Sequence, residues 1–266
     1  KMLGDDIIGL LQIMIEISAN TQIDEEIRGY ALKFLLSAVN FKKNKISSKK
    51  LGKDITLVAL KIVSEPVDAE TELEDDDDDN ENEESTPSRL ALRLIDVAST
   101  VLPLSQVVGT IFEQLPHMLE SSNLFERRAG FLAVGYAVSG APDFYSTKLD
   151  KILTGLVAGL KDAEILVRLA ALRALAMLII DLKDLISVHY ETLLPLIIEI
   201  IDSASNVTIY KYGCISLDGL IEFMSIEGIT KYLEPLMNKL FHMLQVTTEN
   251  PKLRAIIVSA IGSTAY

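Results

Sequence analysis

The feature that most constrains the fold is a pattern that returns about every 40 residues. Six segments begin with a basic residue and carry apolar residues three and six positions later. A base followed by apolar residues at these offsets marks one stripe of an α-helix. The starts of the segments are 61, 39, 40, 43 and 43 residues apart. They read RGYALKFLLSA, RLALRLIDVAS, RAGFLAVGYAV, RLAALRALAML, KYGCISLDGLI and RAIIVSAIGST, and they begin at Arg28, Arg89, Arg128, Arg168, Lys211 and Arg254.

Each of these helices follows another helical pattern, so the repeating unit is a pair of helices. No strand pattern competes with the pairs, and one pair cannot bury its apolar stripe alone. We therefore predict an all-α fold, an α-solenoid of about six pairs that forms one array over residues 1–266. The first helices would lie outside and the second helices would form the concave face. Both ends stop inside a helical pattern, so we expect a piece of a longer solenoid. The first helices are predicted near 5–18, 48–63, 104–120, 146–160, 188–202 and 230–246.

The long first interval contains a strongly acidic stretch. Residues 72–84, ELEDDDDDNENEE, carry ten acids and no base. The thirteen acids between Glu65 and Glu84 account for the whole net charge of −13, because the rest of the chain has 25 acids and 25 bases. Removing about twenty residues restores the common period. We therefore predict that residues 65–86 are an acidic loop inserted within the second helix pair.

This acidic tract, residues 72–84, has two interpretations. Low hydrophobicity and dense like charge prevent folding, so most such runs are solvated linkers. A partner attracted by charge would instead be basic, and it would be drawn to this one place. The candidate binding residues are Glu72, Glu74, Asp75, Asp76, Asp77, Asp78, Asp79, Glu81, Glu83 and Glu84.

Two further sets of charges are candidates. Asp218 and Glu222 lie one turn apart on a predicted concave helix and could receive a lysine of a bound peptide, although helical acids are usually only solvated. FKKNKISSKKLGK, residues 41–53, is a solvated loop and helix start, a basic signal or phosphate patch, or a segment that folds against the acidic tract. The repeated bases are expected to pair with acids at the turns, such as Asp24, Asp162 and Asp202.

Signals for catalysis, metal binding and membrane insertion are missing from the sequence. The three histidines show no metal-ligand spacing. Phosphate-loop and nucleophile-elbow motifs do not occur. The lone Cys214 falls on the apolar stripe, where a packed thiol is expected. The apolar runs are too short to cross a bilayer, and one lysine cluster is no basic face for nucleic acid. We predict no enzyme activity, no cofactor, no metal and no membrane contact.

The amino-acid sequences of the repeats resemble those of a known family. DAEILVRLAALRALAML, residues 162–178, is similar to a HEAT repeat, and that resemblance extends across all six units. ERRAGFLAVGYAVSGAPDFY (126–145) and TLLPLIIEII (192–201), together with an acidic loop inside one pair, resemble the importin β (karyopherin β) family. The resemblance is to its importin-four type, which includes the fungal carrier of ribosomal proteins and core histones.

The resemblance implies a nuclear import receptor segment. Such a receptor would be monomeric, would bind basic localisation signals of ribosomal proteins and core histones, and would be regulated by Ran-GTP. It would contact FG-repeat nucleoporins and shuttle between cytoplasm and nucleus. Two alternatives remain: a HEAT-repeat scaffold of a multiprotein complex, or an acidic histone chaperone in which the tract alone screens basic proteins.

Overall fold

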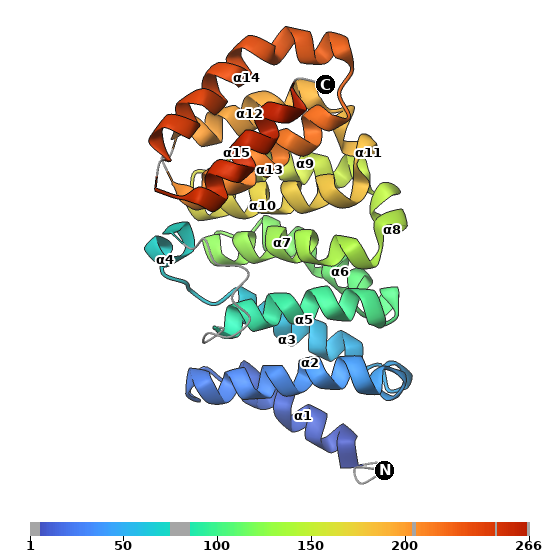
Figure 1. Cartoon of the computed structure of the whole chain (residues 1–266). Helices are drawn as coiled ribbons and strands as arrows, with labels where there is room; N and C mark the ends of the chain where they lie inside the picture. Colours follow the sequence, from blue (N-terminus) through green and yellow to red (C-terminus); the bar gives the residue numbers. More distant parts are fainter. Residues whose placement is uncertain (1–5, 75–85, 204–205, 248, 265–266) are drawn as a thin grey trace. The chain divides into compact units, whose positions relative to one another are not determined.

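The structure, a computed structural model, describes residues 6–74, 86–203, 206–247 and 249–264. Within these ranges every regular element is helical (Figure 1), which confirms the all-α prediction. The chain forms two compact units, residues 1–66 with 79–144 and residues 67–78 with 145–266. Each unit is described by itself below.

The first unit contains three helix pairs. They are α1 (Asp6–Ala19) with α2 (Glu25–Ser48), α3 (Leu51–Val63) with α5 (Pro87–Val101), and α6 (Val108–Leu119) with α7 (Leu124–Ala137). The second helices pack on one another, α2 on α5 and α5 on α7, while α3 packs on α1 and α6. Two short 3-10 helices complete this unit: η1 (Leu104–Gln106) precedes α6, and η2 (Val138–Gly140) packs on α5. The short α8 (Pro142–Ser146) follows.

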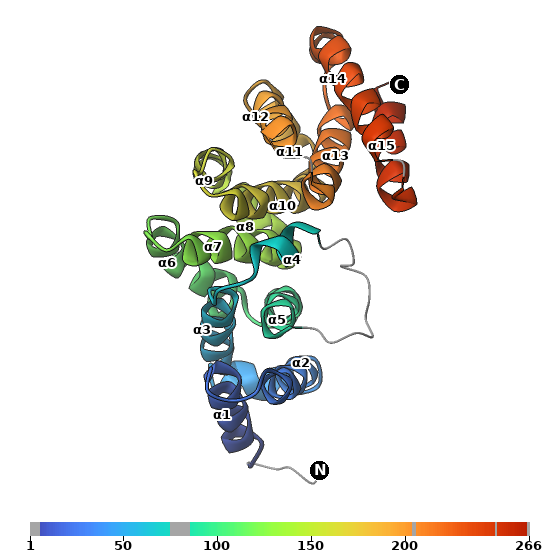
Figure 2. The ribbon, with the colours of Figure 1, turned by 90° about the vertical axis from the view of Figure 1, so that its left-hand side faces the viewer.

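The second unit repeats this arrangement. Its pairs are α9 (Leu149–Leu160) with α10 (Ile165–Leu182), α12 (Tyr190–Ser203) with α13 (Val207–Glu222), and α14 (Ile226–Val246) with α15 (Pro251–Ser263). The second helices α10, α13 and α15 pack in sequence, and α9 contacts α12. Figure 2 shows α9 and α12 on one side of this unit and α10 and α13 on the other. The short α11 (Asp184–Ser187) joins the first two pairs.

The turns before the second helices carry short polar caps, except at α10, whose N-cap makes no side-chain hydrogen bond. A side-chain oxygen at the N-cap accepts hydrogen bonds from main-chain N–H groups that have no partner inside the helix. Thr86 caps α5 through the N–H of Arg89 at 3.4 Å, and Asn206 caps α13 through the N–H groups of Thr208 and Ile209. Asp24, Asn123 and Asn250 cap α2, α7 and α15 in the same way.

The predicted apolar stripe forms the core. Burial of such side chains is the main favourable term in folding. Three positions after the repeated base, every side chain is buried, and six positions after it only Phe34 is half-buried. The buried residues at these positions are Ala31, Leu92, Phe131, Ala171, Cys214, Ile257, Ile95, Val134, Ala174, Leu217 and Ala260.

Candidate functional site

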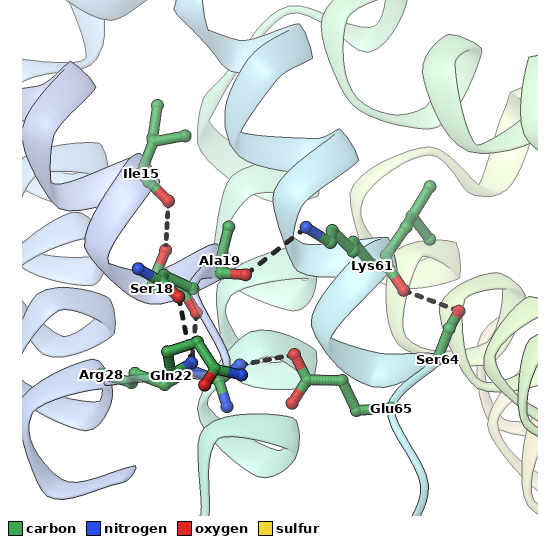
Figure 3. Close-up of polar contacts among 10 residues, drawn as sticks. Ile15, Ser18, Ala19, Gln22, Arg28, Lys61, Ser64 and Glu65 are labelled. Carbon is green, nitrogen blue, oxygen red and sulfur yellow. Dashed lines mark hydrogen bonds and ion pairs between the residues drawn. The ribbon is translucent and has the colours of Figure 1, made fainter. Parts of the chain in front are cut away.

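The point where the acidic insertion begins is held rigidly. Glu65, directly after α3, accepts a hydrogen bond from Nη2 of Arg28 at 2.5 Å. The Arg28 side chain is 4% exposed, and its Nε also donates to the carbonyl of Ser18 at the end of α1, at 2.9 Å. Figure 3 shows Arg28 between these two acceptors. Removing either ion of such a pair leaves the other poorly solvated, so the contact fixes the point where the insertion begins.

Two more cations hold the same end of α3. Arg128 on α7 is 2% exposed and donates through Nη1 to the carbonyl of Val63, at 3.2 Å. Lys61 donates to the carbonyl of Ala19, at 3.4 Å (Figure 3). These carbonyls lie at helix C-termini, where the partial negative charge of the helix favours cations. The first and third helix pairs therefore both fix the point where the insertion begins.

The downstream end of the insertion is fixed at Thr86 and the buried Pro87. Proline at the first position of a helix costs no hydrogen bond. Among the predicted site residues, Glu72 and Glu74 lie in the described helix α4 (Ala69–Glu74). The others lie outside the described residues: Asp75, Asp76, Asp77, Asp78, Asp79, Glu81, Glu83 and Glu84.

The lysine cluster at 41–53 lies at the other end of α5. Gln106, which follows α5, accepts a hydrogen bond from the N–H of Gly52 and donates to the carbonyl of Ser47. The C-terminal end of α5 therefore lies beside the lysines, whereas the insertion rejoins the chain at its N-terminal end. The 15 residues of α5 separate the two points by about 22 Å. Contact between the lysines and the acidic tract would have to cross this length, and it stays a prediction.

The first part of the insertion is a helix that packs far along the chain. The sequence predicted a loop over 65–86, but α4 forms within it and packs on α13 and α10. Thr208 on α13 donates through Oγ1 to the carbonyl of Leu73, at 2.7 Å. Val67 and Leu73 are half-buried, while Glu70 stays exposed. The sequence contains one weak signal for this helix, two apolar residues among the acids.

Asp218 and Glu222 lie one turn apart on α13, as the sequence predicted. Asp218 is half-buried, and its carboxylate accepts hydrogen bonds from Ser259, at 3.2 Å, and from Ser263 on α15. Glu222 is exposed at the last turn. Asp218 therefore joins α13 to α15, which the sequence did not foresee. Its use by a lysine of a cargo remains a proposal.

Cys214 gives a direct test of packing around α13. Burial, followed by the nearby Asp218 charge, raises the pKa of its thiol to about 12. Because the thiolate is the reactive form, we expect almost no modification by a disulfide reagent at pH 8 in the native chain. Modification should become complete in denaturant, measured by absorbance at increasing times. Rapid reaction of the native chain would contradict the packing.

The repeated bases differ in part from the prediction, because Arg28 does pair with an acid, Glu65, but not with one of the three acids named for it. We expected them to pair with Asp24, Asp162 and Asp202, but Asp24 caps α2 and Asp202 pairs with Lys239. Arg168 donates to the main-chain carbonyl of Asp162, at 2.7 Å. Arg254 donates to the carbonyl of Leu244, at 3.2 Å. Arg128, Arg168 and Arg254 thus donate to main-chain carbonyls near helix C-termini, which are acceptors that a sequence does not display.

The described residues contain no group of three or more His, Cys, Asp or Glu side chains placed to hold a metal. No described helix combines the length and the hydropathy that crossing a bilayer requires.

Helix pairs of about 40 residues, stacked through their second helices and interrupted by an acidic insertion, define a HEAT-repeat protein. No protein-family model matches the chain. The "Probable importin subunit beta-4" of Schizosaccharomyces pombe is 34% identical over all 266 residues, which are 23% of that protein. Importin-4 of Mus musculus is 31% identical over 119 residues, 44% of this chain and 11% of that one. The chain thus spans about a quarter of the first of these relatives.

Solved structures agree on the fold. Kap121p bound to Pho4p has a TM-score of 0.83 at 22% identity, covering 100% of this chain and 26% of that one. Kap121p bound to RanGTP has a TM-score of 0.81 at 21% identity, covering 99% and 26%. These structures show the fold. The sequence relatives show that the chain belongs to the importin β family and is of the importin-4 type.

Proposed function

We propose that this chain is a segment of a nuclear import receptor that captures basic cargo with its acidic tract. The observation that carries this proposal is the 34% identity with an importin subunit over the whole chain. Solved complexes of the structural neighbour Kap121p contain Pho4p, RanGTP or Nup53p. By analogy, we propose that the complete protein binds basic cargo such as ribosomal proteins and core histones, Ran-GTP and FG-repeat nucleoporins, as a monomer that shuttles between cytoplasm and nucleus.

The fixed attachment of the insertion supports a role in the capture of basic cargo. Arg28 and Arg128 fix the chain at residues 63–65, and Thr86 fixes it again, so the segment whose sequence carries the ten acids is anchored at both ends. An exposed ion pair contributes about 0.2–1 kcal/mol. Five or six such pairs give at most about 6 kcal/mol before ordering costs, an affinity between the millimolar and micromolar scales. The tract therefore accelerates encounter and adds modest affinity, while helix faces must supply tight binding.

Binding of a lysine-rich histone-tail peptide to the full-length protein tests this proposal. Replacing Asp75–Asp79 by asparagine should weaken binding about tenfold at low salt and flatten its salt dependence, because the Debye length falls to about 8 Å at physiological salt. A matched control neutralises five exposed acids outside the insertion: Glu16, Glu120, Asp143, Asp150 and Glu164. Equal weakening by both variants would show that only net charge matters.

Two further experiments distinguish a receptor from a scaffold and from a histone chaperone. Removing residues 72–84 should leave the partners of a scaffold in place, abolish nearly all binding by a histone chaperone, and lower the affinity and rate of a receptor. Adding Ran-GTP should release the peptide from a receptor and from neither alternative. A peptide that stays bound in saturating Ran-GTP would overturn the receptor proposal.

A further inference from the structure

The helix α4 occupies a defined place on the second unit. It is separated from its contacts on α10 and α13 by about a hundred residues or more of sequence, yet it packs against both. The hydroxyl of Thr208 donates to the carbonyl of Leu73, 135 residues earlier in the chain. Val67 and Leu73 are half-buried there. A short acidic helix therefore has a specific binding place.

Thr208, which contacts α4, lies within one turn of an aromatic ring that two cations approach. We call Arg173, Thr208, Lys211 and Tyr212 the α4 seat. The guanidinium carbon of Arg173 lies 5.1 Å from the centre of the Tyr212 ring, and Nζ of Lys211 lies 5.7 Å from it. Cations at this distance are attracted to the ring face, which keeps both near one spot. Thr208 and Tyr212 share a helix face because they are one turn apart on α13.

The charges of helix and seat are complementary. The segment 66–76 reads PVDAETELEDD, with six acids and no base, and Glu72 is half-buried within it. The seat supplies two cations and a hydroxyl donor, so its preference is opposite to that of the acidic tract. Ion pairs are stronger at such partly buried places than at fully exposed ones.

We propose that the α4 seat recognises acidic helical peptides. The helix α4 fills it in cis, and an acidic helical segment of a partner protein takes the same place in trans. A tethered segment competes at millimolar effective concentration, so α4 sets a threshold that the partner must exceed. Six residues form only a marginal helix on their own, which makes α4 displaceable. This proposal does not depend on the capture of basic cargo.

A peptide experiment tests the α4 seat directly. In an opened variant of the chain, Val67–Glu74 is replaced by glycine and serine at equal length, and residues 75–84 stay unchanged. The probe is a fluorescent peptide of residues 66–76, followed by anisotropy. We expect it to bind the opened variant about tenfold or more tightly than the unmodified chain, because cis competition is removed.

Substitutions in the opened variant locate the binding. Thr208→Val removes the donor and should weaken the peptide about tenfold, while Thr208→Ser should restore binding. Lys211→Glu should weaken it further, and the control Lys151→Glu, an exposed lysine on α9, should not. A peptide with glutamine in place of Glu70 and Glu72 should also bind less well.

The proposal is wrong if the peptide binds the opened variant no better than the unmodified chain. It is also wrong if Thr208→Val and Lys211→Glu bind as the opened variant does. Circular dichroism checks that each variant keeps its helices, and Thr208→Ser shows that the site itself is intact. Because the lysine-rich peptide tests the tract separately, failure here leaves the import proposal standing, and the reverse also holds.

Discussion

Replacing Arg28 by alanine is expected to destabilise the first unit by about 3–5 kcal/mol, the usual cost of removing one partner of a buried ion pair. The Arg28 side chain is 4% exposed, and its loss leaves both the Glu65 carboxylate and the carbonyl of Ser18 without their donor. The Glu65 side chain is 23% exposed, so water can solvate it in part, which favours the lower end of that range. Urea unfolding followed by circular dichroism measures the change.

Two controls make this result specific. Lys33→Ala removes an exposed cation from the same helix and should change stability by less than about 0.5 kcal/mol. In the double variant Arg28→Ala with Glu65→Ala, the second change should cost less than it does alone, because no unpaired carboxylate remains. If the Arg28→Ala variant unfolds at the same urea concentration as the unmodified chain, the contacts of Arg28 with Glu65 and Ser18 contribute nothing to stability.

Local periodicity explains why most of the fold could be predicted. A base with apolar residues three and six positions later describes a helix face completely, because each helix buries the same stripe against its neighbours. The caps at Asp24, Asn123 and Asn206 also depend on local geometry, because a short polar side chain satisfies the N-terminus of its own helix. These features need only a few neighbouring residues.

The site needed information that no local pattern carries. The contact between Leu73 and Thr208 joins residues 135 apart, and no sequence pattern in either segment indicates that the two pack together. Arg128 and Arg254 both donate to main-chain carbonyls, which every residue possesses. The dense acidic residues concealed the helix α4, because the charge pattern of residues 65–74 is also that of a solvated linker.

A second large effect is expected where η2 meets α5. A Cβ added at Gly140 would lie 2.3 Å from both the main-chain carbon and the oxygen of Ser99. A main chain inside a helix cannot turn away as a side chain can, so η2 and α5 would have to separate. That movement would also disturb the hydrogen bond from Ser139 to Asp96, whose donor and acceptor are 3.2 Å apart. Overpacking usually costs about 1–3 kcal/mol, and Gly140→Ala is expected at the upper end.

The control substitution is expected to change stability in the opposite direction. Around Gly9 in α1 no atom lies within 4 Å of an added Cβ. Alanine there should stabilise the chain by about 0.5–1 kcal/mol, because it restricts the unfolded chain and favours the helix. Urea unfolding of both variants gives the comparison. Since Gly140 does not have a positive φ, its requirement for glycine is steric rather than conformational. A Gly140→Ala chain as stable as the unmodified one would therefore mean that η2 does not pack on α5 this closely.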